Sequence, residues 1–176
     1  DLDRDYDYIK KEVSKASIMR EAMQYGWGIR ILNQDPWETV VSFIISANNG
    51  ISRIKRSIEN ISKRFGRIIY WNEREFYAFP DAENLAAARE DDLIECGVGY
   101  RAAYIIKTAR MILDKEIKLD DIKNMEYKDA LKEMLRFPGV GPKVADCVLL
   151  FSMGKGEAFP VDVWIQRIMQ ALYLGK

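Results

Sequence analysis

The segment Phe137-Pro138-Gly139-Val140-Gly141-Pro142 constrains the fold of this chain more than any other. It separates two stretches with helical periodicity, at 127–136 and 142–153. Its two glycines allow positive φ angles and a close approach of the backbone, and a proline fits the first turn of the second helix. The valine between the glycines can point into the core and fix the turn. The sequence therefore predicts two helices joined by a tight hairpin.

Most of the remaining chain also has helical periodicity. Asp35 and Pro36 are typical of an N-cap and first turn, and a largely apolar helix is expected to follow over 37–47. Other helices are predicted over 3–25, 51–65, 101–115 and 161–173, and one or two short helices over 84–96. The helix over 51–65 is basic and amphipathic, with an apolar stripe that starts at Ile51. Only 68–71 resembles a strand. The predicted fold class is all-α.

Composition is typical of a globular protein and does not itself indicate a nucleic-acid partner. The 176 residues carry no net charge, and no apolar run approaches the roughly 20 residues of a membrane helix. Basic residues do gather over 53–67 and acidic ones over 81–95, which fits either a basic binding face or two solvated helix surfaces. Two cysteines argue for a reducing compartment.

The residue after the hairpin, Lys143, has a setting that suits a nucleophile. A lysine can attack only when neutral, and both burial and the positive end of a helix disfavour its charged form. The free N–H groups at that helix start can also hold a DNA phosphate. A second candidate is Asp162, alone in an apolar frame, where it can cap a helix, stabilise a developing sugar cation, or do both. The alternative for the hairpin is an ordinary turn between helices.

These residues resemble the helix-hairpin-helix DNA glycosylase superfamily, and within it the 8-oxoguanine DNA glycosylase/AP lyase family, in a bacterial type without histidine. The resemblance covers nearly the whole chain. Four motifs carry it, in this order: 34–38 with 42–44 and 48–54, then 97–102, 138–147 and 160–163. The resemblance implies an all-α catalytic core that lacks the family's N-terminal β-rich domain and its C-terminal helix, and a fragment of a longer protein. It also implies one helical domain over 1–176, divisible into lobes at about 36–126 and at 127–176 with 1–35.

The resemblance further implies roles for individual residues. Lys143 is expected as the nucleophile and Asp162 as the catalytic acid residue. Four residues are expected to act on the bases: Asn48 fills the gap left by the flipped base, Tyr100 wedges into the stack, and Arg53 and Arg101 read the orphaned cytosine. The residues expected at phosphates are Gly139, Gly141 and Trp164. Cys147 is expected beside the damaged base. The alternatives are a turn-forming asparagine, a packed tyrosine, solvated arginines and a core cysteine.

The expected activity is excision of 8-oxoguanine opposite cytosine through a lysine Schiff base, followed by β-elimination at the abasic site. We expect no required cofactor, no iron–sulfur cluster and, at most, a cation at the hairpin. The expected partner is damaged double-stranded DNA, bound by a monomer in the cytoplasm or nucleus rather than a membrane-bound or secreted protein. The other candidates are a bifunctional glycosylase for another damaged base and a non-catalytic DNA-binding module.

Overall fold

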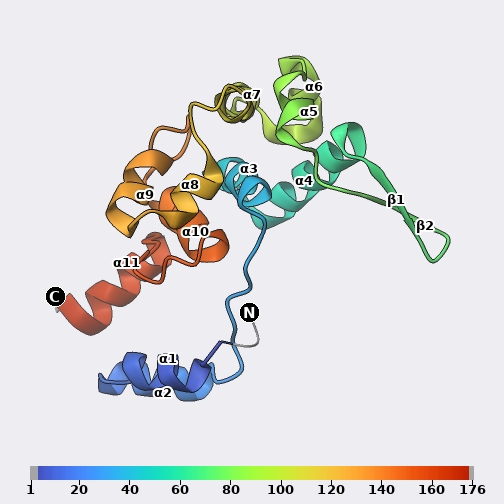
Figure 1. Cartoon of the computed structure of the whole chain (residues 1–176). Coiled ribbons are helices and arrows are strands. Elements are labelled where there is room, and N and C mark those ends of the chain that lie inside the picture. The colour runs from blue at the N-terminus through green and yellow to red at the C-terminus, as the bar shows by residue number, and fades with distance from the viewer. Residues whose placement is uncertain (1–3, 175–176) are drawn as a thin grey trace. The chain divides into compact units, whose positions relative to one another are not determined.

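The computed structural model describes residues 4–174 and is mainly helical (Figure 1). The chain forms two compact units, one over Gln34–Pro160 and one made of Asp1–Asn33 with Val161–Lys176. We call them the core unit and the terminal unit. The division into lobes near residues 36 and 127 stays a prediction. Across residues 4–174 no helix has both the length and the apolar character that crossing a membrane requires.

The core unit is organised around an apolar helix. Its elements are α3 (Pro36–Ser46), α4 (Ile51–Phe65), β1 (Ile68–Trp71), β2 (Arg74–Tyr77), α5 (Ala82–Ala86), α6 (Glu90–Leu93), the π-turn η1 (Ile94–Val98), α7 (Arg101–Leu113), α8 (Leu119–Asn124), α9 (Tyr127–Met134) and α10 (Pro142–Ser152). Helix α3 contacts α4, α7 and α10. Its Val40, Val41, Ile44 and Ile45 are fully buried, which confirms the predicted central helix. Burial of each such side chain contributes about 1.5–3 kcal/mol.

Helix α4 has the predicted limits, but its apolar stripe begins one turn later than expected. Ile61 is fully buried and Ile54 packs against the core, whereas Ile51 is 85% exposed. The prediction for Ile51 was wrong because the helix starts in a loop, before it reaches the core. The charge clusters also meet: Arg64 donates to the carboxylates of Asp92 and Glu95, at 2.5 and 2.6 Å.

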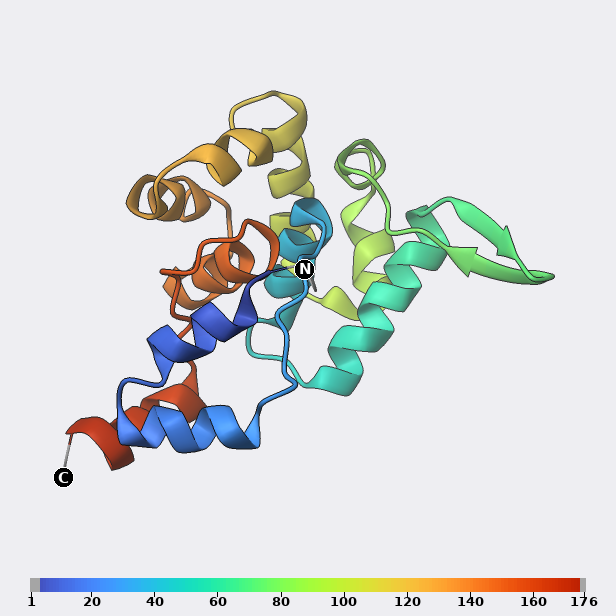
Figure 2. The same ribbon diagram turned by 60° about the horizontal axis from the view of Figure 1, so that its bottom comes forward.

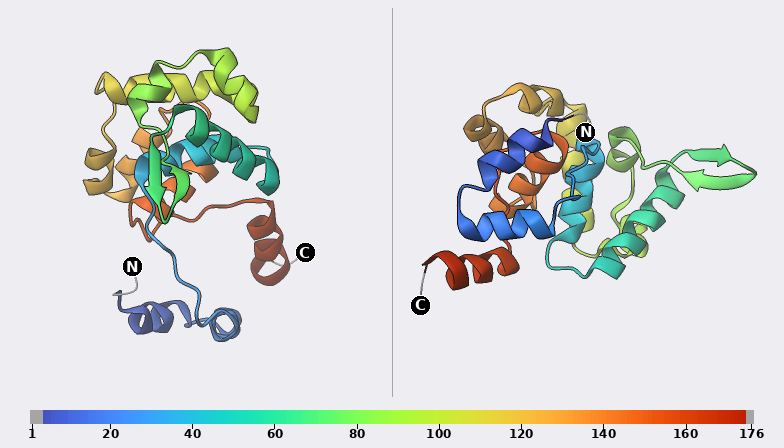
Figure 3. Two further views of the ribbon diagram at one scale, coloured as in Figure 1. Left: turned by 90° about the vertical axis from the view of Figure 1, so that its right-hand side faces the viewer. Right: turned by 90° about the horizontal axis from the view of Figure 1, so that it is seen from below.

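After α4 the chain forms a small antiparallel hairpin, which projects from the end of that helix (Figures 2 and 3). The expected strand over 68–71 is confirmed as β1, and β2 was not predicted. The turn between them uses Asn72 and Glu73, both with positive φ. Helix α8 was also missed.

Within residues 4–33 and 161–174, the terminal unit contains four short helical segments. These are α1 (Tyr6–Val13), α2 (Ser17–Tyr25), α11 (Val163–Met169) and the π-turn η2 (Gln170–Leu174). The single helix expected over 3–25 is divided where the helical hydrogen bonds stop, after Val13. Within the unit, the Lys10 ammonium lies 3.1 Å from the centre of a Trp27 ring, a cation–π contact that buries the lysine.

Candidate active site

The hairpin between α9 and α10 has the predicted construction. Phe137 and Val140 are 2% and 7% exposed, and the Val140 N–H donates to the Phe137 carbonyl at 3.1 Å. Gly139 has φ near +78°, where other residues are strained. The turn is thus fixed from inside by two apolar side chains, while Gly139 and Gly141 remain on the surface.

The first turn of α10 offers backbone donors to an anion. Gly141 is the N-cap residue and provides no side-chain cap, and Pro142 follows at the first helical position. The next N–H groups, of Lys143 and Val144, belong to the set that a helix start leaves without an intrahelical partner. Such donors at the positive end of a helix dipole suit a phosphate oxygen.

A side-chain hydrogen bond joins the two helices of this motif. The Tyr127 hydroxyl on α9 donates to Asp146 Oδ1 on α10 at 2.8 Å. The hydrogen bond to the carboxylate, with smaller effects of desolvation and nearby charge, raises the pKa of Tyr127. The bond therefore holds the tyrosine protonated and contributes to the fixed geometry of the hairpin.

Lys143 is half-buried and lies over an aromatic ring. Its Nζ is 5.3 Å from the centre of the Phe43 ring on α3, and Phe43 in turn lies parallel to Phe151 at 6.0 Å between centroids. The face of an aromatic ring attracts a cation. The ring therefore gives the lysine a defined position at the start of α10. The sequence did not identify Phe43 and Phe151 as site residues, because the contact of Phe43 with Lys143 arises from the packing of α3 against α10.

The same two rings line a pocket in the core unit. It has a volume of about 460 Å³ and is bordered by α3, α4 and α10, with Gln34, Glu38, Ser42, Phe43, Ser46, Ile54, Ile58 and Phe151 around it. Partial burial and the nearby Asp35 carboxylate raise the pKa of Glu38. A flat apolar wall beside polar side chains is the usual lining of a site for a planar heterocycle.

Asp162 caps α11. Its Oδ1 accepts hydrogen bonds from the N–H groups of Trp164 and Ile165 at 3.0 and 2.8 Å, so the capping interpretation is confirmed. Asp162 and Trp164 are both exposed, and the Arg167 guanidinium lies 5.2 Å from the centre of a Trp164 ring. Asp162 belongs to the terminal unit and Lys143 to the core unit, so that their approach in the reaction stays a proposal.

The loop between α3 and α4 carries Asn48 on the surface. Asn48 has φ near +49°, which agrees with turn formation, and its neighbour Asn49 fixes the loop by donating to the Ile45 carbonyl at 3.1 Å. Arg53 is exposed and borders, with Asn48, a depression of about 730 Å³. Asn48, which is expected to fill the gap in the DNA duplex, and Arg53, which is expected to read the orphaned base, are therefore both accessible to solvent.

Arg101 has a different environment from the one expected of a base reader. It is 7% exposed, and its guanidinium donates to the carbonyls of Ala47, Asn48 and Val98. These bonds use four of the five N–H donors of an arginine. In this arrangement Arg101 fixes the Asn48 loop from beneath. Tyr100, by contrast, is 60% exposed, as a wedge requires.

Cys147 lies one turn after Lys143 on α10 and is 4% exposed. Its burial agrees with the alternative of a core cysteine, and contact with a base stays a prediction. Among residues 4–174 no cluster of three or more histidine, cysteine or acidic side chains could hold a metal ion.

Comparison with known proteins agrees with this geometry. Residues 41–176 match the model of the HhH-GPD superfamily of base excision DNA repair proteins. Residues 1–40 match the model of the N-terminal domain of 8-oxoguanine DNA glycosylase. In that stretch the structure describes α1, α2 and the start of α3, and no strand over residues 4–40.

Several relatives are similar over most of the chain. A probable N-glycosylase/DNA lyase of Methanothermobacter thermautotrophicus is 43% identical, over 85% of this chain and 54% of the relative. The Clostridium acetobutylicum 8-oxoguanine glycosylase/lyase in its apo form has a TM-score of 0.96 and 45% identity, over 100% of this chain and 62% of the other. The same enzyme with double-stranded DNA containing cytosine opposite 8-oxoguanine has a TM-score of 0.94 and 46% identity, over 98% and 60%.

The chain spans about half the length of the curated relatives it matches. Its family is nevertheless established by a model match over more than three quarters of its residues, together with the hairpin that the structure forms at 137–142. This chain belongs to the HhH-GPD superfamily of base excision DNA repair proteins.

Proposed function

We propose that this chain is the catalytic core of a bifunctional DNA glycosylase/AP lyase that removes 8-oxoguanine opposite cytosine. The observation that carries the proposal is the position of Lys143, at the start of α10 and directly after the hairpin. Its Nζ is 5.3 Å from the centre of the Phe43 ring, which also lines the 460 Å³ pocket. Alkyl-base glycosylases that only release the base need no lysine there. The lysine thus supports the combination of excision and strand cleavage.

In the proposed reaction the neutral Lys143 amine attacks the anomeric carbon of the flipped nucleotide. A bond forms between Nζ and that carbon, and the glycosidic bond breaks with its electron pair leaving on the base. The Asp162 carboxylate stabilises the positive charge that develops on the sugar. Opening of the sugar gives an imine, which acidifies the adjacent C–H, and loss of that proton expels the 3′ phosphate. Water then releases the enzyme from the imine. No cofactor takes part in these steps, and a cation at the hairpin stays a prediction.

The proposed DNA contacts divide by their position in the fold. The hairpin N–H groups at Gly139 and Gly141 and the Trp164 indole hold phosphates, while Asn48 and Tyr100 fill and wedge the gap after the base leaves the stack. Arg53 is exposed and reads the orphaned cytosine. For Arg101 we propose support of the Asn48 loop in place of base reading, since carbonyl groups already occupy its donors.

The lesion assignment is supported by relatives named 8-oxoguanine glycosylase/lyase. We propose that the extruded base enters the pocket beside Lys143, near Cys147, in any compartment that holds genomic DNA. The protein would act there as a monomer.

The test is a cleavage assay on duplexes that contain one 8-oxoguanine opposite each of the four bases. We expect strand nicking without alkali, fastest opposite cytosine, and none with Lys143→Gln. Nicking only of a preformed abasic site would keep the lyase chemistry and refute the lesion. Tight binding without any cleavage would instead support the non-catalytic DNA-binding module.

A further inference from the structure

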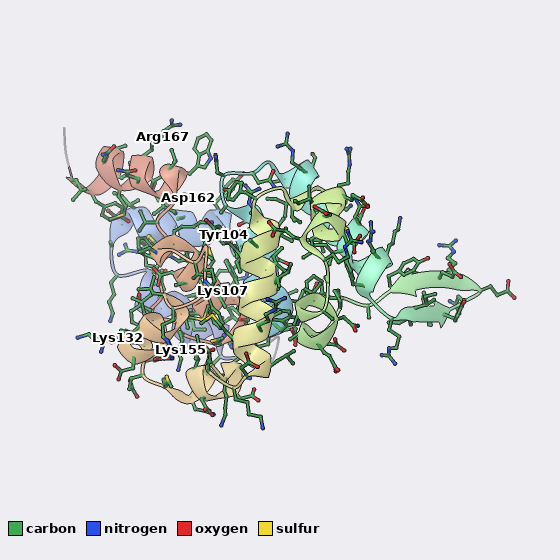
Figure 4. The ribbon with its side chains drawn as sticks, turned by 90° about the horizontal axis from the view of Figure 1, so that it is seen from above. Tyr104, Lys107, Lys132, Lys155, Asp162 and Arg167 are labelled. Atoms are coloured by element: carbon green, nitrogen blue, oxygen red, sulfur yellow. The ribbon has the colours of Figure 1, made fainter. Side chains whose placement is uncertain are left out.

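Tyr104 contacts the residue proposed as the DNA wedge. It lies on α7, where Figure 4 labels it, one turn after Tyr100. The two rings meet edge to face, with centroids 6.0 Å apart and planes at 84°. This geometry is the attractive one for two aromatic rings. Tyr100 is thus held on one side by a neighbour in its own helix.

The ring of Tyr104 also lies against the hairpin. A Cβ atom added at Gly139 would stand 2.6 Å from Tyr104 Cδ2 and 3.3 Å from Cε2 and Cγ. Real Cβ atoms do not approach a ring this closely, so the ring occupies the place that a side chain at residue 139 would need. Glycine is therefore required here by its neighbour as well as by its positive φ.

A third contact reaches Tyr100 from its other neighbour. The Arg101 guanidinium carbon is 4.5 Å from the centre of the Tyr100 ring, and the same guanidinium donates to carbonyls of the Asn48 loop. The three elements proposed to touch DNA are therefore connected in series: the Asn48 loop through Arg101 to Tyr100, and Tyr100 through Tyr104 to Gly139.

Nothing in this series depends on the hydroxyl of Tyr104. Among residues 4–174 that hydroxyl makes no hydrogen bond, and the side chain is 38% exposed. The contacts of Tyr104 with Tyr100 and with the Gly139 position are made by its ring.

We propose that Tyr104 is a positioning residue for base flipping, which fixes the spacing between the phosphate-binding hairpin and the Tyr100 wedge. The proposal rests on the proposed function, because it assumes that both elements contact the same duplex. A wedge held at a fixed distance from the phosphate grip needs no ordering when DNA binds, so that insertion costs less. Tyr104 thereby acts on the reaction through Tyr100, without touching the base.

The test is a double-mutant cycle with Tyr104→Leu and Tyr100→Leu, read by single-turnover excision and by the fluorescence of 2-aminopurine placed in the strand opposite the lesion. Tyr104→Leu should reduce excision and the unstacking signal by roughly tenfold, the upper range for one aromatic pair. In the Tyr100→Leu background it should change neither. Tyr104→Phe keeps the ring and should stay within about twofold of wild type. Lys107→Leu, one turn further along α7, is the control for an exposed site.

The proposal would be overturned if the fold-reductions in excision caused by the two leucine substitutions multiplied in the double variant. It would also be overturned if Tyr104→Leu gave the same unstacking fluorescence as wild type. If circular dichroism shows that Tyr104→Leu is unfolded, the cycle uses Tyr104→Met in its place. The fluorescence readout needs no excision, so a wild type that unstacks DNA but releases no 8-oxoguanine would refute the substrate and leave the cycle valid. A wild type that does not unstack DNA would refute the wedge and this proposal together.

Discussion

Replacement of Arg101 by methionine separates a supporting role from a base-reading role. The substitution keeps much of the side-chain volume and removes the donors to the carbonyls of Ala47, Asn48 and Val98. A buried carbonyl left without a partner costs about 1–3 kcal/mol, and water can reach part of this loop. For three carbonyls we therefore expect a loss of about 3–5 kcal/mol in the free energy of unfolding.

Urea unfolding followed by circular dichroism measures this loss directly. In a chain of this length 1 kcal/mol corresponds to about 2–4 °C, so the thermal midpoint of Arg101→Met should fall by on the order of 10 °C. Arg53→Met is the matched control, since Arg53 is exposed and its substitution should stay within about 0.5 kcal/mol of wild type.

The same pair of variants tests specificity. Arg53→Met should excise 8-oxoguanine with a weaker preference for cytosine opposite the lesion, because its exposed guanidinium is the proposed reader. An Arg101→Met variant that is as stable as wild type and has lost the preference for cytosine would refute the supporting role of Arg101. That result would mean that Arg101 leaves the carbonyls when DNA binds.

Three further substitutions test the fold and the site. Gly66→Ala should lower the free energy of unfolding by about 2 kcal/mol or more, because the new Cβ would lie 1.9 Å from a backbone oxygen. Gly50→Ala is the control, since a Cβ there meets open space. Equal urea midpoints for the two variants would contradict the predicted clash at residue 66. The hydrogen bond to a carboxylate raises the pKa of Tyr127 in the folded protein. The contribution of this hydrogen bond to stability is therefore complete below the pKa of about 10 that tyrosine has in the unfolded chain, and it disappears as pH rises through the pKa of the folded state. Tyr127→Phe should accordingly unfold at lower urea than wild type at pH 7–9, and the difference should shrink above about pH 10; a constant difference up to pH 11 would exclude the hydrogen bond as its cause. Asp162→Asn should keep the cap of α11, since asparagine caps a helix as well as aspartate does. The variant should nevertheless excise the base about a hundredfold more slowly. An unchanged excision rate would show that the carboxylate takes no part in the chemistry.

The hairpin and the limits of α4 were predictable because local chemistry determines them. Proline and glycine at 138–142 leave few other conformations, and the apolar period over 51–65 corresponds to one helix. The second strand, β2, was missed because its four residues alternate too briefly to stand out, and its turn depends on two residues with positive φ. Such turns have a weak signature when the second residue is not glycine.

The side-chain environments at the site could not be predicted in the same way. The sequence identifies an arginine at 101, but its burial follows from the way that α7 meets the loop after α3. The contacts of Phe43 with Lys143 and of Tyr104 with Gly139 likewise join residues far apart in sequence. Such pairs depend on packing between helices, for which local periodicity carries no information.

Borohydride trapping is the most direct measurement of the central claim, that Lys143 is the nucleophile. The chain would be incubated with a duplex containing one 8-oxoguanine opposite cytosine, reduced, digested and sequenced by mass spectrometry. We expect a DNA adduct on the peptide that contains Lys143, and we expect Lys143→Gln to lose the adduct while it still binds DNA. An adduct on any other lysine, or trapping of Lys143→Gln at the wild-type level, would contradict it.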